Sequence, residues 1–263
     1  MLIPEYQVTA VRYGTATRLR STQFHRYNVY DEPDGEIVLD YFFWIISDGE
    51  TIVLVDTGYH PDSLQKRIGG TCIIPPLEAL RRLGIAASDV SRIVISHFHY
   101  DHVGNVSAFP QAQLFLQRRE LDFWTGPNGS RPAVLPGIEP SEISYLENAY
   151  HSGRAEVLDG NREIAPGIYA EMVGGHCPGQ QLVIVEGERP LVLCSDALHF
   201  YEEMDRRMPY TSFVDLPAMY DTYDVLERHE RQKQAIIVAG HDPAVMSRFP
   251  RDERAPDLAV RLR

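Results

Sequence analysis

A short run of histidine and aspartate residues, directly after an apolar segment, constrains this chain most strongly. An apolar RIVI segment precedes residues 96–102, which read SHFHYDH. Side chains two apart on an extended segment point the same way, so His97 and His99 can bind one metal ion together. Asp101 and His102 follow the predicted strand end and can turn toward a second ion. Structural zinc sites are more often closed and rich in cysteine, so this pattern favours an open catalytic metal site.

Three further apolar segments each end in a single residue that can bind a metal. A glycine-rich turn, GGHCPG, follows a predicted strand and presents His176. The segment LVLCSD ends in Asp196, and the segment AIIVAGH ends in His241. The same pattern thus recurs along the chain: a buried strand, then a small residue, then a candidate ligand. We expect this arrangement to bring all seven candidate ligands to one edge of a sheet core.

With these motifs in this order, the chain resembles the metallo-β-lactamase superfamily from about Tyr41 to about Pro243. The segment TIVLVDTG, which ends at Gly58, resembles the family's early strand with its Asp-Thr-Gly ending. The resemblance implies an α/β fold, a four-layered αβ/βα sandwich of the metallo-β-lactamase type. It also implies a dinuclear metal site. The ligands of the first ion would be His97, His99 and His176. The ligands of the second ion would be Asp101, His102 and His241. Asp196 would be the carboxylate that both ions share. Asp56 would then orient a ligand imidazole from outside.

Several residues near these motifs have plainer interpretations. Asp56 could simply end a strand in a turn, since Asp-Thr-Gly is common turn chemistry. Cys177 lies beside His176, but the ligand set is complete without it, which favours a packed thiol. Cys194 belongs to an apolar strand and Cys72 is equally unremarkable, and three cysteines at irregular spacing give no disulfide framework. The histidines without a partner motif are predicted to be surface or locally bonded residues: His25, His60, His151 and His229.

Length and composition bound the class of protein. The 263 residues, 44% of them hydrophobic, suffice for one sizeable core, so we expect a single domain over 1–263. A net charge of −12 opposes binding to nucleic acid, because such binding depends on neutralising phosphates. No segment approaches the length of a membrane span, and the N-terminus lacks a basic and apolar leader. These features predict a cytoplasmic protein that binds a small-molecule substrate and no membrane; monomer and homodimer stay open.

Hydrophobic periodicity predicts several regular elements. A hairpin is expected at 37–46 and 51–55, helices at 75–83 and 217–232, and a helix start at 103–109. The alternation of such strands and helices is typical of a sheet sandwich flanked by helices.

Two stretches fit this pattern poorly and are candidates for the walls of the substrate pocket. Residues 125–153 contain several prolines and glycines before a helical pattern, and we expect them to cover the metal edge as an insertion. Residues 24–30 are rich in aromatic side chains and could line the same mouth. Simple packing is an equal alternative for both stretches, although specificity tends to lie in loops.

The predicted chemistry follows from the metal ions. We expect two Zn²⁺ ions per chain, although Mn²⁺, Fe²⁺ or Co²⁺ could occupy the same ligands. Two ions that share a carboxylate lower the pKa of a bridging water, and the resulting hydroxide attacks an electrophilic carbonyl. One ion stabilises the oxyanion, and Asp101 is both a ligand and a candidate proton shuttle. No side-chain nucleophile is required.

Within the superfamily, the ligand set resembles that of the N-acyl-homoserine lactonases, which are quorum-quenching enzymes. Those enzymes carry a tyrosine three residues after the bridging aspartate, where its hydroxyl contacts the substrate. Here His199 occupies that position, and Tyr201 lies two residues further on. An imidazole can donate a hydrogen bond and transfer a proton near neutral pH, so His199 can replace the tyrosine as a catalytic residue. We therefore predict a hydrolase that opens a lactone ring, with a supporting or surface role for His199 as the alternative.

Other activities of the same superfamily are the rival interpretations. A thioesterase of the glyoxalase II type uses similar ligands but needs a basic cradle for glutathione, which is not obvious beyond Arg248, Arg251 and Arg254. Another ester or amide hydrolase fits the same mechanism. A persulfide dioxygenase would bind a single iron, and a β-lactamase would normally use cysteine on its second ion. A non-enzymatic, metal-stabilised binding protein would have no hydrolytic activity to lose on metal removal.

Overall fold

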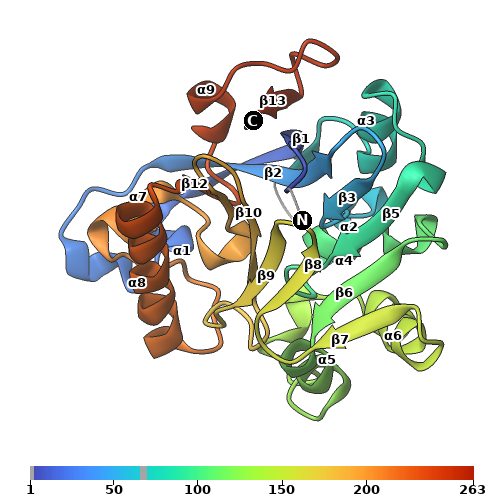
Figure 1. Cartoon of the computed structure of the whole chain (residues 1–263). Coiled ribbons are helices and arrows are strands. Elements are labelled where there is room, and N and C mark those ends of the chain that lie inside the picture. Colours follow the sequence, from blue (N-terminus) through green and yellow to red (C-terminus); the bar gives the residue numbers. More distant parts are fainter. Residues whose placement is uncertain (1–2, 66–69) are drawn as a thin grey trace.

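Two β-sheets pack face to face, with helices on both outer sides (Figure 1). The structure is a computed structural model that describes residues 3–65 and 70–263. Within these residues the larger sheet has eight strands and the smaller has five. The layers therefore follow the order helix, sheet, sheet, helix, and the predicted four-layered αβ/βα sandwich is confirmed.

The larger sheet has the strand order β13-β1-β2-β3-β5-β6-β7, and β4 pairs with β1 at the side. Its strands are β1 (Gln7–Leu19), β2 (Glu36–Ser47), β3 (Ile52–Val55), β4 (Gly70–Cys72), β5 (Val90–Val94), β6 (Gln113–Gln117), β7 (Ala155–Leu158) and β13 (Ala259–Arg261). Strands β3, β5, β6 and β7 are mutually parallel, so their carboxyl ends meet at one edge.

The smaller sheet has the order β12-β11-β10-β9-β8. Its strands are β8 (Arg162–Ala165), β9 (Ile168–Met172), β10 (Gln181–Val185), β11 (Leu191–Leu193) and β12 (Ile236–Val238). Because β11 and β12 are parallel, their carboxyl ends also share an edge.

The longer helices form the two outer layers, and the described residues also contain several one-turn helices. The α-helices are α1 (Arg20–Gln23), α2 (Pro61–Gln65), α3 (Pro76–Arg82), α4 (Tyr100–Val103), α5 (Arg118–Thr125), α6 (Pro140–His151), α7 (Tyr201–Arg206), α8 (Leu216–Lys233) and α9 (Val245–Arg248). Helices α3, α5 and α6 contact the larger sheet, whereas α8 contacts the smaller sheet at β12 (Figure 1). None of these described helices is long and apolar enough to cross a membrane.

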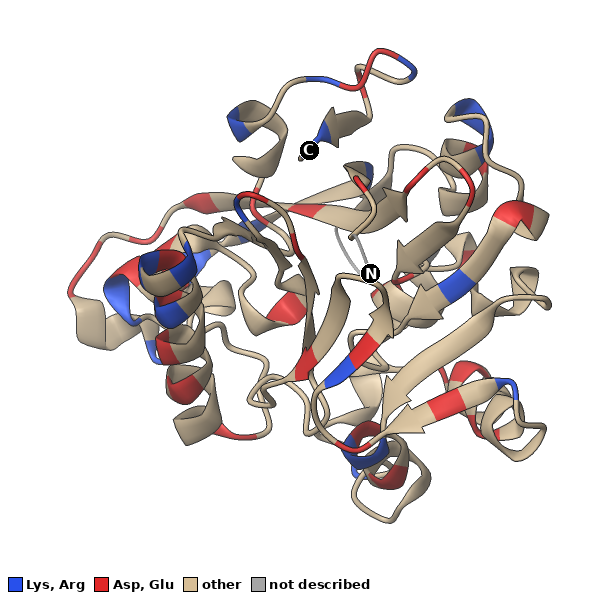
Figure 2. Ribbon diagram, viewed as in Figure 1, with Lys and Arg blue, Asp and Glu red and all other residues tan. Residues whose placement is uncertain are grey.

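Strand β2 shows why four layers form. It is buried along most of its length, and its successive side chains enter two different cores. Phe43 packs in the core beneath the helices of the larger sheet, while Trp44 packs in the core that contains the residues of the smaller sheet. Since successive strand residues point to opposite faces, a strand apolar on both faces has to be covered on both. Charged residues of both signs lie on the helices, in the loops and on several strands (Figure 2).

Most of the predicted elements agree with the structure. The hairpin is formed by the antiparallel strands β2 and β3, and the two helices correspond to α3 and α8. The helix start at 103–109 was predicted wrongly, because α4 begins within the metal-binding motif at Tyr100 and ends at Val103. Asn105 then leaves the helix, and its side-chain amide donates hydrogen bonds to the carbonyl oxygens of Thr57 and Tyr59.

Candidate metal centre

The seven candidate ligands come from four separate segments that meet at the same edge of the sandwich. The loop after β5 carries two histidines, and α4 carries an aspartate and a histidine directly after it. The turn between β9 and β10, the 3-10 turn Ser195–Ala197 after β11, and the loop after β12 each supply one more. In this order the residues are His97, His99, Asp101, His102, His176, Asp196 and His241, and all are buried except the partly exposed His99.

One group of imidazoles surrounds one oxygen of Asp196. His176 Nε2 lies 3.3 Å from Asp196 Oδ2 and 2.9 Å from His99 Nδ1. His97 Nε2 is 3.8 Å from the same carboxylate oxygen. These three histidines are the residues that the family resemblance assigns to the first ion.

The other oxygen of Asp196 faces the second group. Both His102 Nε2 and His241 Nε2 lie 3.0 Å from Asp196 Oδ1. Asp101 Oδ2 is 3.6 Å from His102 Nε2 and 3.9 Å from His241 Nε2. Asp196 thus lies between the two groups, with one oxygen toward each, as a carboxylate that bridges two ions would.

Hydrogen bonds outside the cluster determine which ring nitrogens point inward. The Nδ1 atoms of His176 and His241 pair with the carbonyl oxygens of Ser212 and Asp40, at 2.7 and 2.8 Å. His97 Nδ1 lies 3.1 Å from the hydroxyl of Ser96. In each case Nε2 is left for the interior, which is how supporting residues usually orient metal-binding histidines.

Asp56 provides the same support for His102. Its Oδ2 lies 2.7 Å from His102 Nδ1 and accepts a 2.7 Å hydrogen bond from the Ser96 hydroxyl, while Oδ1 accepts one of 2.8 Å from the Ser96 amide. Ser195 Oγ donates to the same Oδ2 at 3.2 Å. The prediction that Asp56 orients an imidazole is therefore confirmed as a contact. Asp56 and Ser195 both have a positive φ, of 63° and 47°, a strained conformation that often accompanies functional sites.

The donor set fits divalent metal ions. In the described chain, His97 Nε2 and His102 Nε2 are buried and have no hydrogen-bond partner, although carboxylate oxygens lie nearby. Buried polar atoms normally have a partner, so one unpaired imidazole nitrogen in each group fits a site that binds metal through both groups. Imidazole and carboxylate donors suit Zn²⁺, Fe²⁺, Mn²⁺ and Co²⁺. The residues present can hold two such ions.

Burial and charge control the ionisation of the cluster. Burial lowers the pKa of His97 and His176 well below the usual range and that of His99 to about 4, which leaves the neutral rings that bind metals. Burial also acts on His102, but the carboxylates of Asp196, Asp101 and Asp56 outweigh it and raise its pKa. The surrounding imidazoles hold the pKa of Asp196 well below its usual range despite its burial.

The structure distinguishes His199 from Tyr201. His199 is fully buried, its Nε2 lies 3.1 Å from Asp196 Oδ2, and its ring stacks on Tyr210 with the centroids 3.6 Å apart. Tyr201 instead packs in the core against Arg248, whose guanidinium carbon is 3.6 Å from the ring centroid. His199 is the one of the two that reaches the ligand cluster.

Cys177 is the one cysteine that contacts this cluster in the described residues. Its Sγ lies 3.5 Å from His99 Nε2, the nitrogen opposite the one that faces His176. Burial, followed by the nearby carboxylate of Glu120, raises the pKa of the thiol well above its usual range. A protonated thiol on the outer edge of His99 agrees with a packed thiol. Cys194 is buried in the core and Cys72 is half-buried, and both are free thiols as predicted.

We expect cobalt-substituted protein to show no thiolate-to-cobalt charge-transfer band in the near ultraviolet, because the Cys177 thiol is protonated and faces the outer nitrogen of His99. Absorption spectra of Co²⁺-loaded wild type and Cys177→Ser check this, and the two spectra should coincide. A strong near-ultraviolet band that disappears in Cys177→Ser would make Cys177 a ligand.

Glu120 was missed by the sequence reasoning, yet it connects the two ligand-bearing loops of the first group. Its Oε1 accepts hydrogen bonds from the amide of Phe98 and the indole of Trp124, at 3.0 and 2.6 Å. Its Oε2 accepts one of 2.8 Å from the amide of Gly179. Glu120 lies three residues after β6 with no metal motif around it, so no sequence signal marks it.

Of the two stretches predicted to shape the pocket, 125–153 reaches the cluster, whereas 24–30 packs against the segment that carries Tyr210. A Cβ atom added at Gly137, within the 125–153 stretch, would lie 2.7 Å from His99 Nε2. On the other side, the Tyr210 hydroxyl donates to Gln23 Oε1 at 2.9 Å, and the amide of His25 donates to the Pro209 carbonyl oxygen. The segment around residues 24–30 therefore packs against the chain that carries Tyr210.

The four remaining histidines lie outside the ligand cluster, as predicted. His60 and His151 are exposed, His25 packs edge-on against the ring of Phe213, and His229 Nε2 lies 2.9 Å from Glu171 Oε2.

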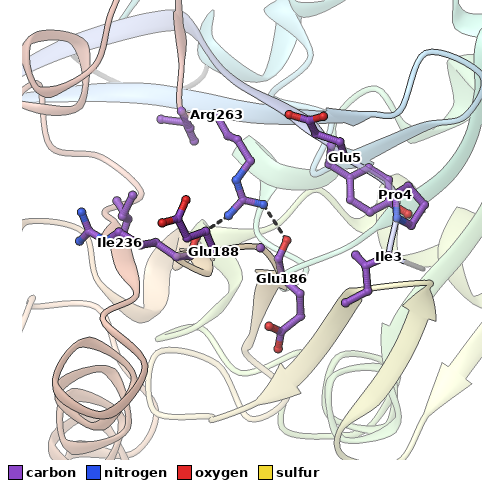
Figure 3. Close-up of a pocket in the computed structure, with 11 residues that line it drawn as sticks. Ile3, Pro4, Glu5, Glu186, Glu188, Ile236 and Arg263 are labelled. Carbon is purple, nitrogen blue, oxygen red and sulfur yellow. Dashed lines mark hydrogen bonds between the residues drawn. The ribbon is translucent and has the colours of Figure 1, made fainter. Parts of the chain in front are cut away.

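A separate surface cavity of about 570 Å³ has none of the candidate ligands among its lining residues (Figure 3). The Arg263 guanidinium in its wall donates to the carbonyl oxygens of Glu186 and Arg189. Its charged lining residues have both signs, namely Glu5, Glu186, Glu188, Arg189 and Arg263.

The fold and the motifs together define the class of protein. Residues 37–241 match the family described as "Metallo-beta-lactamase superfamily", and the chain belongs to that superfamily. The resemblance predicted from the histidine and aspartate motifs is thereby confirmed.

Individual relatives indicate which members of the superfamily this chain is similar to. An N-acyl homoserine lactonase of a Bacillus species is 26% identical over 225 residues, which covers 79% of this chain and 84% of the relative. The N-acyl homoserine lactonase AttM of Agrobacterium fabrum is 24% identical over 191 residues, or 69% and 68% of the two chains. A solved structure of AidC, described as a dizinc quorum-quenching lactonase with bound product, has a TM-score of 0.74 at 19% identity, covering 92% of this chain and 90% of that one.

Proposed function

We propose that this protein is a metal-dependent hydrolase that opens lactone rings, with N-acyl homoserine lactones as the first substrates to test. The observation that carries the proposal is Asp196, whose two oxygens each face a separate group of ligand atoms. Relatives described as N-acyl homoserine lactonases at 24–26% identity support the choice of substrate.

In this proposal the first ion, Zn²⁺ by default, is held by His97, His99 and His176, and the second by Asp101, His102 and His241. Asp196 would be a ligand of both ions. Two divalent ions in these positions would supply hydroxide near neutral pH and polarise a carbonyl group. The protein's own residues orient the ligand rings and surround the cluster with buried side chains.

His199 and Asp101 are the proposed catalytic residues. His199 Nε2 lies at the Asp196 oxygen that faces the first group, 3.1 Å away, where it can donate a hydrogen bond to a carbonyl or ring oxygen of the substrate. Asp101 Oδ2 lies beside the second group, between 3.6 and 3.9 Å from two ring nitrogens, where it can accept and return a proton. His199→Phe is expected to slow turnover while the metal content stays unchanged.

The charge around the cluster favours a neutral substrate. In the described chain the ion pairs of Asp101 and Asp196 are with imidazoles alone, and no lysine or arginine is among their partners. A glutathione thioester carries carboxylates that need basic partners. A lactone ring with an acyl chain carries no charge, and it fits such a site better.

The 125–153 insertion is proposed to wall the pocket above the first ion within one domain spanning 1–263. Gly137 supports this role, since it approaches the ring of His99 so closely that a side chain would meet it. The segment around residues 24–30 is proposed to line the opposite side, next to Tyr210.

The deciding experiment is proton release after mixing zinc-loaded protein with N-hexanoyl homoserine lactone in weakly buffered solution near neutral pH. Ring opening yields an acid, so we expect rapid acidification that stops when a chelator removes the metal and returns when zinc is restored. Protein that holds two ions, releases no protons from lactones and instead cleaves a glutathione thioester would be a thioesterase. Oxygen uptake with a persulfide and one bound iron would identify a dioxygenase.

A further inference from the structure

Glu203 is a fully buried carboxylate next to the candidate catalytic centre that the proposed mechanism does not use. Its Oε1 accepts a hydrogen bond of 2.8 Å from the amide of Phe200. Its Oε2 accepts hydrogen bonds from the Tyr223 hydroxyl at 2.8 Å and from the Tyr210 amide at 3.2 Å. Burying a carboxylate is costly even when it is hydrogen-bonded, so its presence here calls for a reason beyond capping the beginning of α7.

The fourth neighbour of this carboxylate is His199. Its Nδ1 lies 3.5 Å from Glu203 Oε1, while its Nε2 lies 3.1 Å from Asp196 Oδ2. Neither ring nitrogen of His199 has a hydrogen-bond partner among the described residues. Each nitrogen therefore faces one carboxylate, and the ring lies between the two.

Glu203 also holds the residue that stacks on the His199 ring. Tyr210, whose amide donates to Glu203, stacks on His199 with an angle of 16° between the ring planes. The hydroxyl of Tyr210 is held in turn by Gln23. One carboxylate thus acts on the edge of the imidazole directly and on its face through Tyr210.

We propose that Glu203 is a positioning residue for His199, which accepts a hydrogen bond from Nδ1–H and keeps Nε2 directed at Asp196 and the reacting oxygen. The inference rests on the proposed role of His199. A separation of 3.5 Å is longer than a formed hydrogen bond, but catalytic hydrogen bonds are often long without substrate and shorten when it binds. A carboxylate that orients an imidazole in this way is a general device of catalytic sites.

The test compares Glu203→Gln with Tyr223→Phe in zinc-loaded protein. Tyr223→Phe is a matched control, because it removes a hydrogen bond to the same carboxylate but leaves the oxygen that faces His199. We expect Glu203→Gln to lower kcat for lactone opening by about tenfold to a hundredfold with KM and metal content little changed. Tyr223→Phe should keep a kcat close to that of wild type.

Two further readouts separate positioning from general destabilisation. In a His199→Gln background, Glu203→Gln should have no further effect on kcat, since the two residues act as one unit. Histidine ring-nitrogen NMR of ¹⁵N-labelled, zinc-loaded protein, with His199 assigned by its loss in His199→Gln, should show a changed signal for that ring in Glu203→Gln. An undiminished kcat in Glu203→Gln, or an equal loss in both backgrounds, would overturn the proposal. Failure of the wild type to open any lactone would refute the proposed function. The NMR result would then decide whether Glu203 positions His199. A changed His199 signal in Glu203→Gln supports this contact, and an unchanged signal overturns it.

Discussion

Asp196→Asn is expected to abolish hydrolytic activity, with a loss on the order of a thousandfold or more, because removing one electrostatic contribution at a reacting centre already costs 10²–10³. The reason is geometric, since both oxygens of Asp196 are used, one toward each ligand group. The pKa of Asp196 lies well below its usual range, so the side chain is charged at neutral pH and balances the ions. An asparagine of the same size removes that charge and can offer an oxygen to one group only.

The measurement is metal content by elemental analysis together with turnover of the lactone. We expect the variant to retain fewer than two ions per chain after dialysis. Asp205→Asn, an exposed aspartate on α7, is the control and should behave like wild type. A variant at Asp196 with two ions and substantial turnover would show that the bridging assignment is mistaken.

Asp56→Ala is expected to destabilise the protein by about 3–5 kcal/mol, the cost of removing one partner of a buried ion pair. Asp56 is fully buried and holds His102, Ser96 and Ser195 through its two oxygens. Its φ of 63° adds to the loss, because alanine tolerates this conformation less well than aspartate or asparagine. Metal affinity should fall by about tenfold to a hundredfold, since His102 loses the contact that orients it.

Urea unfolding with and without zinc measures the first effect, and a zinc titration with a competing chelator measures the second. Asp56→Asn is the matched comparison, because it retains the side-chain shape and the backbone preference but loses the charge. It should be less destabilised than Asp56→Ala while still binding zinc more weakly than wild type. Equal zinc affinity in wild type and both variants would reduce Asp56 to a turn residue.

The sequence predicts those elements of the fold whose pattern of apolar and polar residues lies within one short stretch of the chain. The hairpin β2–β3 and helix α8 follow from periodicity within single windows, and the structure confirms both. Strand β1, thirteen residues long, was not predicted. This strand pairs with β13 and β2 at its two sides, and most of its residues are buried. It also contains Thr9 and Arg12, so its sequence shows neither a simple alternation of apolar and polar residues nor a continuous apolar run.

The same distinction holds within the site. Each candidate ligand belongs to a short motif that follows an apolar strand, which makes it visible in a few residues of sequence. Apart from Asp56, the residues that support the ligands are visible only in three dimensions. The carbonyl oxygen of Asp40 holds His241 from 201 positions away, and that of Ser212 holds His176 from 36 positions away. Backbone carbonyl groups have no sequence signature at all.

The sequence by itself determined the superfamily, the layered fold and the seven side chains that meet at one edge, because ligand chemistry and strand ends are local properties of the chain. Only the tertiary structure decided that His199 rather than Tyr201 reaches Asp196, that the ring held by Asp56 is His102, and that Glu203 and Tyr210 contact His199. These contacts join residues from different strands and loops. Their geometry depends on how the two sheets pack, and packing is a property of the whole chain.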